Sequence, residues 1–111
     1  DKNGYLYKNV VGTDLFDDTQ LTSSEGFGVS ELFDVTSIKT LKVTHYAEYT
    51  NRPLLFTDAN GIITSVTRMT QVAQGDGSYV TIVSVPQDAV YCATFFNLGD
   101  KLPIINAIEF R

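Results

Sequence analysis

The sequence predicts an all-β fold, an antiparallel β-sandwich of about eight strands. The first observation behind this prediction is the content of β-branched residues, 13 Thr, 11 Val and 7 Ile, because these side chains favour extended backbone. The second is their distribution in short runs between turn-forming residues, without a long apolar stripe at helical spacing. Such a regular alternation of strands and turns is typical of a sandwich or a jelly roll.

Each expected strand is a short run rich in apolar and β-branched residues. The predicted strands cover residues 5–8, 28–34, 41–49, 54–57, 62–69, 79–85, 91–97 and 104–110. Clusters of Gly, Pro, Asn, Asp and Ser separate them and predict turns at 22–26, 51–53, 58–61, 74–78, 86–88 and 98–100. Residues 14–18 are expected to form a short turn or helical turn, with Asp14 as its cap.

Two local predictions are sharper than the rest. At 58–61 the sequence Asp-Ala-Asn-Gly predicts a tight hairpin, in which Asn60 and Gly61 supply positive φ angles. Along 41–49 the residues alternate, so one face carries apolar side chains and His45 while the other carries Tyr46. We therefore expect His45 at the core edge or at an interface, and Tyr46 to be the more accessible of the two.

Length and composition predict one domain. The chain has 111 residues and a hydrophobic content of 43%, with 7 Phe and 6 Tyr, which is enough material for one core. It begins at Asp1 rather than Met, so we interpret 1–111 as a fragment of a larger protein. Within it, 1–13 is expected to be a lead-in segment and 14–111 the sandwich core.

The net charge argues against nucleic acids and anionic membranes as partners of the domain. The net charge is −5, and the 8 basic residues are scattered, whereas phosphate backbones and anionic lipid surfaces attract clustered positive charge. No stretch approaches the roughly 18 consecutive apolar residues of a membrane-spanning helix. We therefore expect neither nucleic-acid binding nor membrane insertion.

The chain offers little for catalysis, and we expect it not to be an enzyme. It contains one histidine, His45, and one cysteine, Cys92, too few for a zinc site built from these residue types. Cys92 lies in an apolar run and is interpreted as a buried structural thiol. A hydrolase would need two of the carboxylates at Asp17, Asp18, Glu25, Asp34, Asp58, Asp76 and Asp100 to meet in a cleft.

No cofactor is expected, and calcium is the one cation that we keep as an alternative. Oxygen ligands from acidic loops suit this hard cation. However, the segments at 58–61 and 76–77 are shorter than a twelve-residue calcium loop, and both form good turns without a metal.

Aromatic residues beside polar ones supply the best candidate for binding. Sugars are recognised by a flat aromatic ring together with hydrogen-bonding groups, and the sequence predicts such a mixture near two strand ends. The candidate carbohydrate-binding residues are Tyr46, Tyr49, Arg52 and Asn97. The chain contains no Trp, the best stacking platform.

Four segments occur in an order that resembles a known family. They are Asp-Leu-Phe at 14–16, Phe-Asp-Val at 33–35, Phe-Thr-Asp-Ala-Asn-Gly at 56–61 and Val-Pro-Gln-Asp-Ala-Val-Tyr at 85–91. Over about 14–97 the chain resembles the galactose-binding-like jelly-roll modules of phage tail and receptor-binding proteins and of bacterial carbohydrate enzymes. Pro86, Ala89 and Tyr91 correspond to fold markers of these modules. The family's Ala-x-Tyr-x-Arg ending is absent, because Ala93 stands where the Arg would be.

The resemblance implies a non-catalytic carbohydrate-binding or attachment module of a phage tail fibre, tailspike or similar surface protein. Its implied ligand is a host surface glycan or polysaccharide, and its implied location is the virion or the extracellular space. Neighbouring domains of a parent protein, and a homotrimer, are the implied protein partners. The alternative is a structural or oligomerisation sandwich that packs on neighbouring domains without a sugar ligand, with Tyr46, Tyr49 and Phe96 at the interface.

Overall fold

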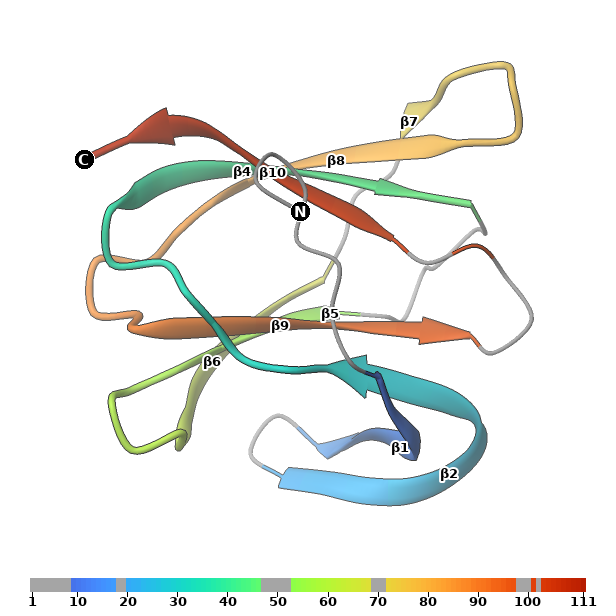
Figure 1. Ribbon diagram of the computed structural model, residues 1–111, viewed down its shortest axis with the longest axis horizontal. Coiled ribbons are helices and arrows are strands. Elements are labelled where there is room, and N and C mark those ends of the chain that lie inside the picture. Colours follow the sequence, from blue (N-terminus) through green and yellow to red (C-terminus); the bar gives the residue numbers. More distant parts are fainter. Residues whose placement is uncertain (1–8, 18–19, 47–52, 69–71, 98–100, 102) are drawn as a thin grey trace.

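The computed structural model describes residues 9–17, 20–46, 53–68, 72–97, 101 and 103–111 (Figure 1). The described residues form strands and no helix. The strands are β1 (Asn9–Asp17), β2 (Gln20–Ser30), β3 (Phe33–Asp34), β4 (Ile38–His45), β5 (Pro53–Thr57), β6 (Ile63–Arg68), β7 (Val72–Ala73), β8 (Tyr79–Ser84), β9 (Tyr91–Asn97) and β10 (Ile104–Phe110).

The strands form two antiparallel sheets that face each other. One sheet has six strands, in the order β1-β2-β9-β5-β6 with β3 also paired to β9, and the other has four, in the order β10-β4-β8-β7. Figure 1 shows the four-stranded sheet above and the six-stranded sheet below it. The all-β antiparallel sandwich predicted from the sequence is confirmed. The predicted strands at 91–97 and 104–110 have the observed bounds of β9 and β10.

A two-stranded ribbon connects the two sheets. In one sheet β3 pairs with β9, and in the other β4 pairs with β8. Between them, Val35 N donates to Val90 O at 2.9 Å and Val85 N donates to Lys39 O at 2.9 Å. The pairing therefore continues while both strands change sheets, which is the Greek-key type of connection found in sandwiches and jelly rolls.

The N-terminal hairpin differs from the sequence prediction. Residues 14–17 belong to β1 and residues 22–26 to β2, where turns were expected, so both predictions are wrong. The register moves from Val11 opposite Gly28 to Thr13 opposite Ser23. The polar, Gly-containing segment around Glu25 therefore sits in an irregularity inside a strand rather than in a turn between strands. β1 also begins at Asn9, within the segment interpreted as a lead-in.

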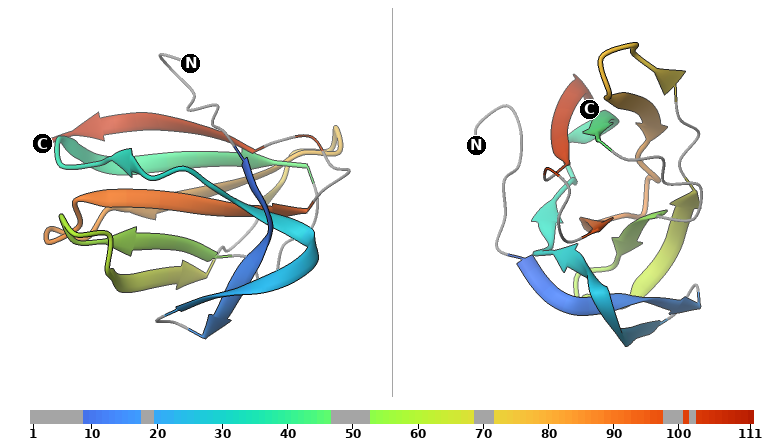
Figure 2. Two further views of the ribbon diagram at one scale, coloured as in Figure 1. Left: turned by 60° about the horizontal axis from the view of Figure 1, so that its bottom comes forward. Right: turned by 90° about the vertical axis from the view of Figure 1, so that its right-hand side faces the viewer.

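The β1–β2 end of the six-stranded sheet curls beneath β9, β5 and β6, on the side of these strands that faces away from the four-stranded sheet (Figure 2). It joins the sheet only through Phe27–Val29, which pair with Phe95–Asn97 of β9. The pairing of β2 to β9 then stops, and Ser30 Oγ accepts a hydrogen bond from Thr94 N at 3.0 Å. The hairpin thereby covers the outer side of these strands while it stays part of the same sheet.

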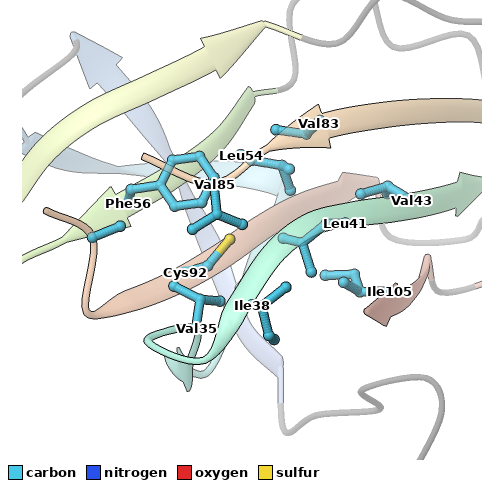
Figure 3. Packing of buried hydrophobic residues seen from close by; sticks show 11 residues of the cluster. Val35, Ile38, Leu41, Val43, Leu54, Phe56, Val83, Val85, Cys92 and Ile105 are labelled. Carbon is cyan, nitrogen blue, oxygen red and sulfur yellow. The ribbon is translucent and has the colours of Figure 1, made fainter. Parts of the chain in front are cut away.

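The main core lies between the sheets (Figure 3). Its buried residues come from both sheets and from the crossing ribbon: Val35, Ile38, Leu41, Val43, Leu54, Phe56, Val83, Val85, Ala89, Cys92 and Ile105. A second cluster consists of Val29, Leu55, Ala93 and Phe95, with Ile63 and Val66 packed against it. Because side chains alternate along a strand, Leu55 and Ala93 face the opposite side of the sheet from Leu54 and Cys92. That side is the one beneath which the hairpin runs.

The hairpin at 58–61 is confirmed as the connection between β5 and β6. Its backbone differs from the expectation, because only Gly61 has a positive φ, of 79°. Asp58 N donates to Ile62 O, and Gly61 N donates to Asp58 O. This is the pattern of a type I turn followed by a left-handed glycine, in which Asn60 needs no positive φ.

Edge strand β10 is irregular. Its register against β4 shifts between Ala107 and Glu109 and again between Glu109 and Phe110. At this point Thr40 Oγ1 donates to Glu109 Oε1 at 2.6 Å. The last residue, Arg111, donates from Nε to Ile38 O at 3.1 Å and from Nη2 to Val85 O at 2.7 Å, so it ties β10 to β4 and β8.

Candidate binding site at one end of the sandwich

One end of the sandwich carries the candidate sugar-binding residues that the structure describes. We name it the Tyr46 end: here β4 and β9 end and β5, β8 and β10 begin, at the right of Figure 1. Tyr46 follows β4 directly, and Asn97 is the last residue of β9. The fold thus brings the backbones of these two candidates, from different sheets, to the same end. Tyr49 and Arg52 lie outside the described residues.

Tyr46 presents an aromatic ring beside a cation. As predicted, it is more accessible than His45, being half-buried while His45 is buried. Lys101, the exposed residue between β9 and β10, places its Nζ over the Tyr46 ring, 5.2 Å from the ring centroid. A cation at this distance is attracted by the negative face of the ring. The pair combines a flat apolar surface with a strong hydrogen-bond donor.

Asp76 adds a carboxylate near the same lysine. It lies in the β7–β8 turn, and its Oδ1 accepts hydrogen bonds from Ser78 N at 2.9 Å and from Ser78 Oγ at 2.5 Å. These bonds lower the pKa of Asp76, and the positive charge of Lys101 lowers it further by a smaller amount. Sequence reasoning missed Lys101, because nothing in the linear sequence indicates that it lies near residues 46 and 76.

His45 lies in the interior beside this end. It is fully buried, its Nε2 lies 3.3 Å from Thr81 Oγ1, and its ring stacks on Tyr79 with 5.9 Å between centroids and 12° between planes. The interpretation of His45 as a core-edge histidine is confirmed. A general base must reach the proton that it removes, and the packing of His45 between the sheets keeps it from a surface-bound substrate.

Cys92 is buried in the main core, as predicted. In Figure 3 its sulfur lies among Val35, Ile38 and Val85. Burial raises the pKa of the thiol far above its usual range, because the thiolate would lose its hydration there. A nucleophilic cysteine needs the opposite shift, so Cys92 acts as a small hydrophobic residue.

Three of the acidic loop residues are turn formers. Asp34 Oδ1 accepts from Thr36 N at 2.8 Å and from Thr36 Oγ1 at 2.6 Å, and these bonds lower the pKa of Asp34. Asp58 Oδ1 accepts from the backbone N of Asn60 and of Ile62, at 2.8 and 3.0 Å. With Asp76, these carboxylates each bond to the backbone of their own turn, as Asx turns do.

The structure does not describe the side chains of the remaining acidic candidates, Asp17, Asp18, Glu25 and Asp100. In the described part of the chain, no group of three His, Cys, Asp or Glu side chains is placed to hold a metal ion. In that same part, no helix is long and apolar enough to span a membrane.

Comparison with known proteins gives no match. No family model fits the sequence, and neither a curated protein nor a solved structure matches the chain significantly.

Proposed function

We propose that this chain is a non-catalytic carbohydrate-binding or attachment module that recognises a surface glycan through the Tyr46 end of the sandwich. The observation that carries the proposal is the pair formed by Tyr46 and Lys101, a half-buried ring with a cation over it. Sugar rings stack on aromatic faces through their C–H groups, while their hydroxyls take hydrogen bonds from neighbouring polar groups. Asn97, Tyr49 and Arg52 are the other residues proposed to contact the sugar.

Two further features support a binding role rather than catalysis. The chain's single histidine and single cysteine are both fully buried. Asp34, Asp58 and Asp76 are hydrogen-bonded within their own turns. The residue types that most often act as a base or nucleophile are therefore engaged in the fold.

The proposed setting is a surface protein such as a phage tail fibre or tailspike, in the virion or extracellular space. A single site of this kind is expected to bind weakly, and several copies on one assembly raise the effective concentration. A homotrimer and neighbouring domains of a parent protein are the proposed partners. This setting rests on the resemblance described above.

A glycan array probed with the domain on a multivalent display tests this proposal. Tyr46→Ala should reduce binding to the glycans that the wild type retains and leave the melting temperature nearly unchanged, because the ring is only half-buried. Tyr91→Ala is the matched control, since Tyr91 is also half-buried but begins β9 at the opposite end of the sandwich. Equal loss of binding in both variants, or no specific binding by the wild type, would contradict the proposal.

The alternative function is a structural module that packs on a neighbouring domain. One observation favours it: the outer face of the four-stranded sheet exposes apolar side chains, among them Ile82 at 57% and Val72 at 61%. Such exposure is common at protein interfaces. If packing through this outer face is the function, Ile82→Lys should shift the oligomer towards monomer in light scattering. Packing through Tyr46, Tyr49 and Phe96 predicts that shift for Tyr46→Ala instead.

A further inference from the structure

The tip of the β5–β6 hairpin combines an asparagine and a glycine in an exposed turn. Asn60 is exposed, and Gly61, which follows it, has a φ of 79°. Glycine has no Cβ, so nothing at this position blocks an approach to its backbone nitrogen. Asn60 directly precedes Gly61, so its side-chain amide lies within reach of the backbone nitrogen of Gly61.

We propose that Asn60 is a site of spontaneous deamidation, with water as the only co-reactant. The backbone N of Gly61 loses its proton to solvent base and bonds to Cγ of Asn60. The bond from Cγ to the side-chain nitrogen then breaks, ammonia leaves with a proton from solvent, and a five-membered succinimide remains. Water opens this ring at either carbonyl, giving aspartate or isoaspartate at position 60. No oxidation or reduction takes place.

The turn geometry controls this reaction. Gly61 N donates to Asp58 O at 3.1 Å, and Asp58 Oδ1 holds the backbone N of Asn60 at 2.8 Å and of Ile62 at 3.0 Å. The nitrogen that must attack is therefore engaged as a donor while the turn is closed. The reaction proceeds from the fraction of molecules in which the hairpin tip opens locally. The hydrogen bonds of Asp58 therefore slow the deamidation of Asn60.

The product changes the turn in two ways. Aspartate at position 60 places a second negative charge beside the Asp58 carboxylate, and like charges at short range repel each other. Isoaspartate also inserts an extra backbone atom into the connection between β5 and β6. Because β6 is the outermost strand of its sheet, we expect modification to loosen β6 before the rest of the sandwich.

Peptide mapping by tandem mass spectrometry tests the proposal on the folded wild-type protein, incubated in mildly alkaline buffer. Conversion at Asn60 should be several-fold faster than at Asn106, which lies in β10 and precedes Ala107. Isoaspartate is scored separately by enzymatic methylation. The mapping also resolves the second Asn-Gly pair of the sequence, Asn3-Gly4. No faster conversion at Asn60 than at Asn106 would overturn the site.

Two variants of Asp58 test whether this residue slows the deamidation of Asn60. Asp58→Ala removes the carboxylate that holds the turn and should raise the conversion rate at Asn60 several-fold. Asp58→Asn keeps an oxygen acceptor without the charge, so a smaller increase is expected. Asn60→Gln should abolish conversion at position 60, because the longer side chain closes a ring far more slowly. An unchanged rate in Asp58→Ala would overturn the role of the turn in controlling the reaction.

Discussion

The two sheets of this sandwich differ in what lies on their outer faces. Phe95 and Leu55, on the outer side of the six-stranded sheet, are 0% and 3% exposed, whereas Ile82 on the outer side of the four-stranded sheet is 57% exposed. The β1–β2 hairpin runs beneath the first face, and the second faces outward (Figure 2). The central strands β5 and β9 of the six-stranded sheet are continuously buried over 54–57 and 92–95, while β4 and β8 of the other sheet alternate between buried and more exposed residues.

The largest effect should come from Phe95→Ala. The change removes a fully buried ring from the cluster on the outer side of β5 and β9, so we expect a loss of about 3–5 kcal/mol in the free energy of unfolding. Chemical denaturation measures it. Ile82→Thr, the comparison variant on the other outer face, should change the same quantity by at most about 0.5 kcal/mol. Equal losses in the two variants would show that both outer faces are buried.

A second effect concerns Cys92, which lies in the core shared by both sheets. Burial raises the pKa of the Cys92 thiol in the folded state. The protonated thiol therefore contributes its full stability at pH values where the thiol of the unfolded chain is also protonated. As the pH rises above about 8.5, the unfolded thiol ionises and the free energy of unfolding should fall, by at most about 1.4 kcal/mol per pH unit. Denaturation of wild type and Cys92→Ala across this range isolates the contribution. Parallel pH profiles would contradict it.

A third effect sharpens the comparison at the edge of the exposed sheet. Arg111→Ala removes the hydrogen bonds to Ile38 O and Val85 O and should lower stability by about 1 kcal/mol. Arg111→Lys keeps the charge but not the planar fork that reaches both carbonyls, so it should recover only part of the loss. Thermal denaturation ranks the three proteins. Full recovery by lysine would assign the effect to charge alone.

The smallest effects should come from Asp34 and Asp76, which belong to turns of different sheets. Hydrogen bonds from Thr36 and Ser78 lower their pKa values. Each ionised carboxylate therefore favours folding above the unfolded pKa of about 3.9, and this contribution disappears as the pH falls through the lower folded value. Asp34→Asn and Asp76→Asn should each flatten the acid limb of the melting-temperature profile slightly. NMR titration of the two carboxyls measures the shifts directly.

The sequence predicted the sandwich and most of its strands because strand periodicity and turn chemistry are local. The bounds of β9 and β10 were predicted correctly, and the alternation along β4 placed His45 inside. The β1–β2 hairpin was missed, because Ser, Gly and Asp in an irregular strand look the same as a turn. The extended register irregularity that bends it depends on tertiary contacts.

The candidate site was less predictable than the fold. Tyr46 was identified from its place near a strand end, but its neighbour Lys101 is brought to it by the connection between sheets rather than by sequence proximity. The roles of Asp58 and Asp76 as turn formers followed from their neighbouring residues, since such bonds are local. A contact between distant segments can be predicted only when the strand topology is known, and short sequence patterns do not indicate the topology.

The two edges of the four-stranded sheet have a consequence for solubility. An exposed edge strand with a regular backbone can template further strands and so lead to aggregation. Here one edge, β7, is only two residues long. The other, β10, changes register twice around Glu109, which interrupts the regular spacing and adds a charge. With Ile82 and Val72 exposed on this sheet, we therefore expect the shape of its edges, rather than the polarity of its face, to hinder the addition of further strands.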